Sequence, residues 1–215
     1  LGKRPIGEIA PTDLLECLQR IENRGAINTA HRAKQLAAMI FRFAVATDRA
    51  ERDISIDLKD ALSTPTKTHF KTFTKPEEIG PLIAAIHAYS GTPVVTAALK
   101  LSPLLLCRPG ELRQMEWAEV DLDKRIIELS ASKMKMGKPH IIPLALQACE
   151  ILGELHFVTG RGVYVFPSAR GNSRPLSDNG VRTALRTLGY TNDQISPHGF
   201  RAMARTVLDE VLHFR

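Results

Sequence analysis

The sequence predicts a mainly α-helical fold with a small antiparallel β-sheet, divided between two domains. Apolar residues recur at helical spacing over most of the chain. Two short β-rich runs, VDLDKRIIELS and HIIPLAL, flank the basic turn KMKMGK, which is the pattern of a β-hairpin. Residues 63–74 lack apolar periodicity and are rich in Ser, Thr, Pro and Lys, as linkers are. We therefore expect a helical domain over 1–62, a linker over 63–74 and an α+β domain over 75–215.

Two helices are predicted in the first domain. Residues 11–21 carry Leu14, Leu18 and Ile21 at helical spacing, and Gly25 follows in a turn. Residues 28–47 form a longer amphipathic helix, whose expected apolar stripe is Ala33, Leu36, Ala37, Ile40 and Ala44. Its polar side includes His31, Arg32, Lys34, Gln35 and Arg42. These residues fit a surface that follows a DNA backbone and fit an ordinary solvated face equally well.

The second domain begins with a capping-box signal, Thr74 with Glu77, before a helix over 76–89. Residues 92–107 are strongly apolar but contain Lys100 and Pro103 and are too short to span a membrane, so we expect a buried core helix. A helix over 110–117 precedes the hairpin, whose tip carries lysines, and a further helix covers 144–155. An extended stretch follows over 162–168.

Two more helices complete the second domain. The first follows Ser177 as its cap and ends at Gly189. The last begins at Ser196 and Pro197, since serine is a favoured N-cap and proline a favoured first helical residue.

Composition indicates an anionic partner and a reducing compartment. The chain has 29 Lys plus Arg against 23 Asp plus Glu, a formal net charge of +6. Cys17, Cys107 and Cys149 are widely separated and lack zinc-ligand spacing, so we expect neither a disulfide framework nor a metal site. This use of cysteine fits a reducing cytoplasm. No signal-peptide pattern opens the chain. Because the first residue is Leu1, we expect a piece of a longer protein.

The stretch SPHGFR places an imidazole and a guanidinium at the start of the last helix. His198 and Arg201 are three residues apart and therefore share a face. The first turn of a helix also presents unpaired N–H groups and the positive end of the dipole, so these cations converge on an anion such as phosphate. Alone, the motif fits local capping and a surface ion pair better.

A second cation has a comparable position in LLLCRPGELRQMEW. Pro109 suits the first position of a helix, which puts Arg108 at its N-cap. Glu111 lies three residues further on and can hold Arg108 by a charge-assisted pair. Taken by themselves, Arg108 and Glu111 indicate a structural ion pair more strongly than catalysis.

Together these motifs resemble the tyrosine recombinases, most closely the integrases of prophages and genomic islands. The matching segments are RPGEL (108–112), WAEVDLD (117–123), MKMGKPHIIPL (134–144), YVFPS (164–168) and SPHGFRAMARTVLDE (196–210). The first domain, from KRPIGEIAPTDLLECLQRIE onward, resembles the DNA-clamping core-binding domain of these integrases. The resemblance thus covers almost the whole chain.

The resemblance implies strand cleavage and rejoining through a 3′-phosphotyrosine, which integrates or excises a mobile element. It assigns the catalytic roles to Arg108, Lys135, His198 and Arg201, with Glu111 supporting Arg108. Lys133 and Lys138 compete with Lys135, but the usual spacing before Pro143 favours Lys135. Two guanidiniums suit the charge that grows on the phosphate oxygens, and a lysine suits protonation of the leaving 5′-oxygen. No metal or other cofactor is implied, because the cations neutralise the charge.

The expected nucleophile has no counterpart in this chain. Tyr89, Tyr164 and Tyr190 all precede HGFR, and His213 follows Arg201 too closely to be the family's later histidine. We therefore expect that both domains are truncated, that the parent protein is the recombinase, and that this piece binds DNA weakly without cleaving it.

The implied partners are double-stranded DNA attachment sites, a homotetramer on DNA in the full-length protein and accessory DNA-bending proteins, with no membrane. The expected DNA contacts are Arg32, Lys34, Gln35, Lys133 and Lys138. Two alternatives remain open: a non-catalytic DNA-binding accessory protein on a recombinase scaffold, and a type IB topoisomerase.

Overall fold

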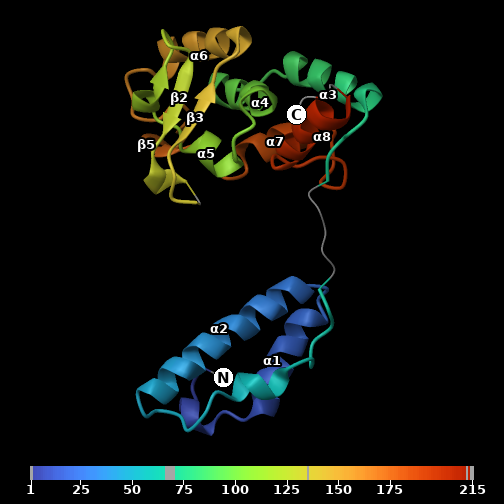
Figure 1. Cartoon of the computed structure of the whole chain (residues 1–215), viewed down its shortest axis with the longest axis vertical. Coiled ribbons are helices and arrows are strands. Elements are labelled where there is room, and N and C mark those ends of the chain that lie inside the picture. The colour runs from blue at the N-terminus through green and yellow to red at the C-terminus, as the bar shows by residue number, and fades with distance from the viewer. Residues whose placement is uncertain (1, 66–70, 135, 212, 214–215) are drawn as a thin grey trace. The chain divides into compact units, whose positions relative to one another are not determined.

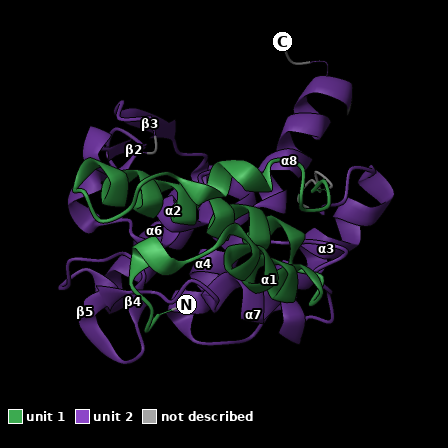
Figure 2. Ribbon diagram, turned by 90° about the horizontal axis from the view of Figure 1, so that it is seen from below, with its two compact units in different colours: residues 1–68 green, residues 69–215 purple. Residues whose placement is uncertain are grey.

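The computed structural model describes residues 2–65, 71–134, 136–211 and 213. The chain divides into two compact units, residues 1–68 and 69–215 (Figures 1 and 2). The predicted fold class is confirmed, since helices predominate and the strands form small antiparallel sheets. Within the described ranges, no helix combines the length and the apolar character that crossing a bilayer would require.

Unit 1 consists of two main helices, α1 (Pro11–Glu22) and α2 (Ile27–Ala46), with the short 3₁₀ turns η1 (Ile6–Glu8) and η2 (Ile54–Leu58). Proline at the first position of α1 and a hydrogen bond from the Ala10 amide to Asp13 start that helix. α1, α2 and η2 pack on one another around a small core. The buried residues of this core are Leu14, Leu18, Ala30, Phe41, Ile54, Leu58 and Leu62.

The apolar stripe expected on α2 is only partly right. Ala44 is buried and Ala33 and Ala37 are half-buried, but the side chains of Leu36 and Ile40 are 60% and 59% exposed. Two apolar stripes run along this helix, and the core of unit 1 uses the one that contains Ala30 and Phe41. The other leaves an exposed apolar face formed by Leu36, Met39, Ile40 and Phe43.

Unit 2 is built around α4 (Pro93–Leu105), the buried helix that the sequence predicts. Leu99 and Leu101 have no exposed surface, and Thr92 caps the helix by accepting from the Val95 amide at 3.4 Å. The helices that pack against α4 are α3 (Pro76–Ala88), α5 (Pro109–Arg113), α6 (Leu146–Thr159), α7 (Gly180–Thr187) and α8 (Gly199–Thr206). α4 therefore connects the segments that carry the motifs RPGEL and HGFR.

The predicted hairpin is confirmed and belongs to a three-stranded antiparallel sheet. Its order is β1 (Val120–Asp121), β2 (Ile126–Leu129) and β3 (His140–Pro143), and Ile127 pairs with Ile142. η3 (Trp117–Glu119) leads into β1, and η4 (Ala131–Lys133) follows β2. A second, two-stranded sheet pairs β4 (Pro167–Ser168) with β5 (Gly171–Pro175), a pairing that sequence periodicity did not predict.

Several expected helix boundaries are wrong. α5 ends at Arg113, and Trp117 begins a separate 3₁₀ turn. The backbone amide of Trp117 donates to the carbonyl of Val163. Lys75 rather than Thr74 is the N-cap of α3, and Asn179 rather than Ser177 is the N-cap of α7. α6 continues to Thr159, whose hydroxyl accepts from Trp117 at 3.2 Å. The last helix begins at Gly199, and a π-helical turn, η5 (Val207–Val211), follows it.

Two leucines of α6 test this description of the core. Leu152 has no exposed surface, whereas Leu146 on the same helix is 60% exposed. We expect Leu152→Ala to lower the free energy of unfolding by about 2–5 kcal/mol, since it removes buried methyl groups and leaves a cavity. Leu146→Ala should change it by less than about 0.5 kcal/mol. Denaturant titration followed by circular dichroism would measure both, and equal losses would contradict the burial of Leu152.

Candidate active site

Arg108 lies at the sharp turn between α4 and α5. Leu106 ends α4 in the left-handed conformation with φ 52°, and Arg108 is the N-cap of α5. The Arg108 amide donates to Glu111 Oε2 at 2.8 Å, and its guanidinium donates to Glu111 Oε1 at 2.5 Å. The Glu111 side chain is 6% exposed and that of Arg108 is 37% exposed. The buried carboxylate of Glu111 thus bonds both the backbone amide and the guanidinium of Arg108 and leaves part of the guanidinium open to solvent.

Arg201 reaches the same turn from α8. Its guanidinium donates to the backbone carbonyl of Leu106, two residues before Arg108. Among the described residues this carbonyl is its hydrogen-bonding partner, and no carboxylate there forms an ion pair with it. Burial raises the pKa of the intervening Cys107 thiol to about 12, and the charge of Arg201 acts on that pKa in the opposite direction. Arg201 therefore lies close to the α4–α5 turn although it is far from it in sequence.

His198 is the N-cap of α8 and lies in the field of both arginines. Burial lowers the pKa of its imidazole, and the positive charges of Arg201 and Arg108 lower it further. The structure thus brings Arg108, His198 and Arg201 into one electrostatic environment with an excess of positive charge. In the absence of an anion this environment favours the neutral imidazole.

The start of α8 differs in detail from the expectation. Ser196 does not cap the helix with its hydroxyl, which is buried and has no hydrogen bond to any residue that the structure describes. Its carbonyl accepts from the Gly199 amide at 2.7 Å. Gly199 is required by a close approach, because a Cβ there would lie 2.6 Å from the carbonyl oxygen of Lys71. The glycine of HGFR is thereby explained by packing against the chain that enters unit 2.

Arg186 supports the loop that leads to His198, a role that the sequence did not indicate. This α7 side chain donates to the carbonyls of Tyr190 and Ile195 and to the side chain of Asn192. It therefore satisfies the backbone of the loop between α7 and α8. Because two of its three partners are backbone carbonyls, no residue pattern in the sequence could identify them.

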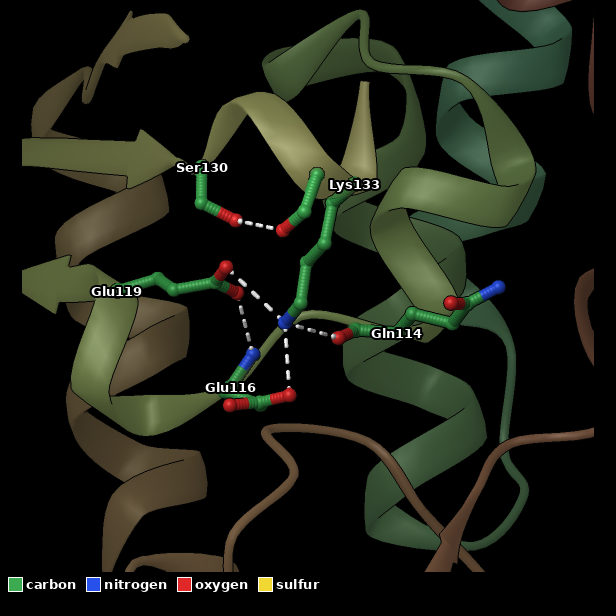
Figure 3. A network of polar contacts seen from close by, with 6 residues as sticks. Gln114, Glu116, Glu119, Ser130 and Lys133 are labelled. Atoms are coloured by element: carbon green, nitrogen blue, oxygen red, sulfur yellow. Dashed lines mark hydrogen bonds and ion pairs between the residues drawn. The ribbon is translucent and has the colours of Figure 1, made fainter. Parts of the chain in front are cut away.

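The lysines of the hairpin have different surroundings. Lys138 is exposed in the β2–β3 connection, as expected, and Lys135 lies outside the described residues. Lys133 is bonded within unit 2, and its expected contact with DNA stays a prediction. Its ammonium bonds Glu116 at 2.8 Å, Glu119 at 3.0 Å and the Gln114 carbonyl at 3.2 Å (Figure 3). All three of its N–H donors thus have partners inside unit 2.

The expected DNA-contacting residues of unit 1 also differ from one another. Arg32 and Gln35 are exposed on α2. Lys34 is half-buried, and its ammonium donates to the carbonyl of Leu58 in η2. Lys34 therefore helps to attach η2 to α2, whereas Arg32 and Gln35 face solvent.

Two family models match the chain. The Phage integrase central domain matches residues 1–61, and the Phage integrase family matches residues 72–212. The integrase of Shigella phage Sf6 is 34% identical over 211 residues, covering 98% of this chain and 54% of the relative. Prophage integrase IntS of Escherichia coli K12 shows the same identity and coverage. The chain thus spans about half the length of these relatives.

Solved integrase structures share the fold. A lambda integrase dimer bound to a COC′ core site has a TM-score of 0.70 at 19% identity and covers 99% of this chain and 61% of its own. The Tn1549 transposon integrase in complex with transposon right end DNA has a TM-score of 0.66 at 16% identity, with coverages of 98% and 76%. Each match extends over nearly all of this chain.

The lowered pKa of His198 gives a testable pH dependence. Because its folded pKa lies below the ordinary value of 6.5, the unfolded chain takes up the proton first, so His198 stabilises the fold above about pH 6.5 and this stability is lost as the pH falls. We expect His198→Gln to flatten the decline in the free energy of unfolding between about pH 7 and pH 5. Titration of the His198 ring proton by NMR, assigned through the same variant, provides the direct check. A pKa above the ordinary value would contradict this electrostatic description.

Proposed function

This chain belongs to the phage integrase family, and we propose that it is the DNA-binding and catalytic portion of a site-specific recombinase of the tyrosine class. The observation that carries the proposal is the meeting of Arg108, His198 and Arg201 at the α4–α5 turn. Positive charge concentrated in this way matches a single DNA phosphate. The relatives named as integrases support the same class of reaction.

We assign the transition-state charge to the two arginines. When a tyrosine hydroxyl attacks a phosphodiester, negative charge grows on the non-bridging oxygens, and guanidiniums meet it with several N–H donors in fixed positions. Glu111 orients Arg108, and the Leu106 carbonyl orients Arg201. His198 supplies a further hydrogen bond to a phosphate oxygen or assists the proton of the nucleophile.

Lys135 is the general acid in this proposal. The leaving 5′-oxygen must gain a proton as the P–O5′ bond breaks, and a lysine ammonium on the β2–β3 hairpin can donate it. The attacking tyrosine belongs to the full-length protein. The proposed reaction uses no cofactor, because side-chain cations provide the charge neutralisation.

Unit 1 is proposed to bind the DNA backbone as a core-binding domain. Arg32 and Gln35 present exposed donors on α2, and Lys138 presents one in unit 2. Lys34 donates one N–H to the carbonyl of Leu58, and its other two N–H donors are proposed to bind the DNA backbone. We further propose that the full-length protein acts as a tetramer on paired attachment sites in the cytoplasm, with accessory DNA-bending proteins. A lambda integrase tetramer bound to a Holliday junction, with a TM-score of 0.69 at 19% identity, is consistent with that assembly.

The alternative function is a DNA-binding accessory protein without chemistry. It requires the same positive surface but no nucleophile. Formation of a covalent protein–DNA adduct separates the two functions, and relaxation of supercoils without site preference would instead indicate a topoisomerase.

The experiment is cleavage of a nicked suicide duplex that carries the attachment site of the element encoding the protein. We expect a covalent adduct with the full-length protein and none with residues 1–215. Arg201→Lys should lower adduct formation about 10²- to 10³-fold, because it removes N–H donors to the charged transition state. Arg161→Lys, at an exposed position after α6, serves as the matched control. No adduct with full-length protein that binds the site would favour the accessory function.

DNA binding by unit 1 can be tested with residues 1–215 and the same duplex without the nick. We expect affinity to fall steeply with salt, since phosphate contacts release counterions. Arg32→Ala should weaken binding and reduce the slope of log K against log salt by about 1. Gln35→Ala should weaken binding with an unchanged slope, because it is neutral. Arg20→Ala, exposed on α1, is the control, and wild-type binding by both α2 variants would remove these contacts from the proposal.

A further inference from the structure

Lys133 occupies a junction between the hairpin and the segment that follows α5. It ends η4, directly after β2, and lies two residues before Lys135 in the sequence. Its side chain is 24% exposed and points to Glu116, Glu119 and the Gln114 carbonyl (Figure 3). These acceptors lie 14 to 19 residues earlier in the chain, so the contact joins two separate segments.

The acceptors are themselves held in place. Glu119 Oε2 accepts from the Glu116 amide at 2.8 Å, so one carboxylate bonds both Lys133 and the backbone of its neighbour. The Trp117 amide donates to Val163, and the fully buried Met115 accepts from Val165. This segment is continuous with α5, whose N-cap is Arg108. Lys133 is therefore bonded to the segment that follows directly from the helix capped by Arg108.

The surroundings of Lys133 favour its charged form. Burial acts to lower the pKa of Lys133, but the bonds to Glu116 and Glu119 outweigh it and the pKa is raised. Glu119 is 11% exposed, so the ammonium also compensates a largely buried carboxylate. A lysine whose donors are occupied in this way is a poor contact for phosphate and a good structural clamp.

We propose that Lys133 is a positioning residue that fixes the start of the β2–β3 connection to the segment that follows α5 and so places the general acid Lys135. This inference rests on the proposed function. In the step concerned, the tyrosine oxygen forms a bond to phosphorus and its proton passes to His198 or to solvent water. The P–O5′ bond breaks, and the 5′-oxygen takes a proton from the Lys135 ammonium. Proton transfer requires hydrogen-bond reach, and a displacement of about 1 Å can cost about 10²-fold in rate.

The test uses the full-length protein and two substrates, one with the natural 5′-oxygen and one with a 5′-bridging phosphorothiolate. A thiolate leaves without protonation, so the second substrate does not need the general acid. We expect Lys133→Met to slow cleavage of the oxygen substrate about 10²-fold and to cleave the sulfur substrate within a few fold of wild type. Lys133→Arg should retain most activity on both, because it keeps the ion pairs. DNA affinity and its salt slope should not change.

Two further variants complete the design. Lys124→Met removes a lysine from the β1–β2 turn whose ammonium bonds Asp121 at 2.8 Å and should cleave both substrates like wild type. Lys135→Met should show the same rescue by sulfur as Lys133→Met.

Each result has a distinct meaning. If Lys133→Met slows cleavage of both substrates equally while the sulfur substrate rescues Lys135→Met, the positioning role alone is overturned. Such a result would indicate general damage to the fold. A weakened affinity with a smaller salt slope would overturn it in favour of a phosphate contact. Failure of sulfur to rescue Lys135→Met would refute the general-acid role and the positioning role with it, and absence of any wild-type adduct would refute the recombinase proposal.

Discussion

The buried carboxylate of Glu111 determines the geometry on which the site depends. It accepts from the Arg108 amide and from the Arg108 guanidinium, so the turn after α4 and the direction of the side chain are fixed by one residue. Arg201 then attaches to that turn through the Leu106 carbonyl, and both charges reach His198. Hydrogen bonds to one backbone reversal thus hold Arg108 and Arg201 near each other, and the positive charges of both lower the pKa of His198.

Some local signals in the sequence predicted local structure, although the helix caps expected at Thr74, Ser177 and Ser196 were wrong. The pair of Arg108 and Glu111 was predictable because the two residues are three apart at a proline-marked helix start. The buried α4 and the hairpin followed from an apolar run and from two β-rich segments around a basic turn. The close approach that requires Gly199 depends on the distant Lys71 and could not be read from HGFR.

Structure was harder to predict where the sequence offers two similar patterns and only one of them is used. α2 carries two overlapping apolar stripes, and only its packing against α1 selects the one with Phe41 over the one with Ile40. The lysines near the hairpin tip look alike in sequence, but the position of η4 turns Lys133 toward Glu116 and Glu119. The charge of a lysine does not tell whether it forms structural ion pairs or contacts DNA, because that depends on which acceptors the fold brings near its ammonium.

The first described residues of unit 2 pack directly against the site. The backbone of Lys71 lies against Gly199, and the rings of Phe73 and Tyr190 form a T-shaped contact with centroids 5.8 Å apart. Residues 71–73 therefore rest on the first turn of α8 and on the loop before it. Because Gly199 directly follows His198, a shift of the Lys71 backbone would displace the turn that carries His198 and Arg201.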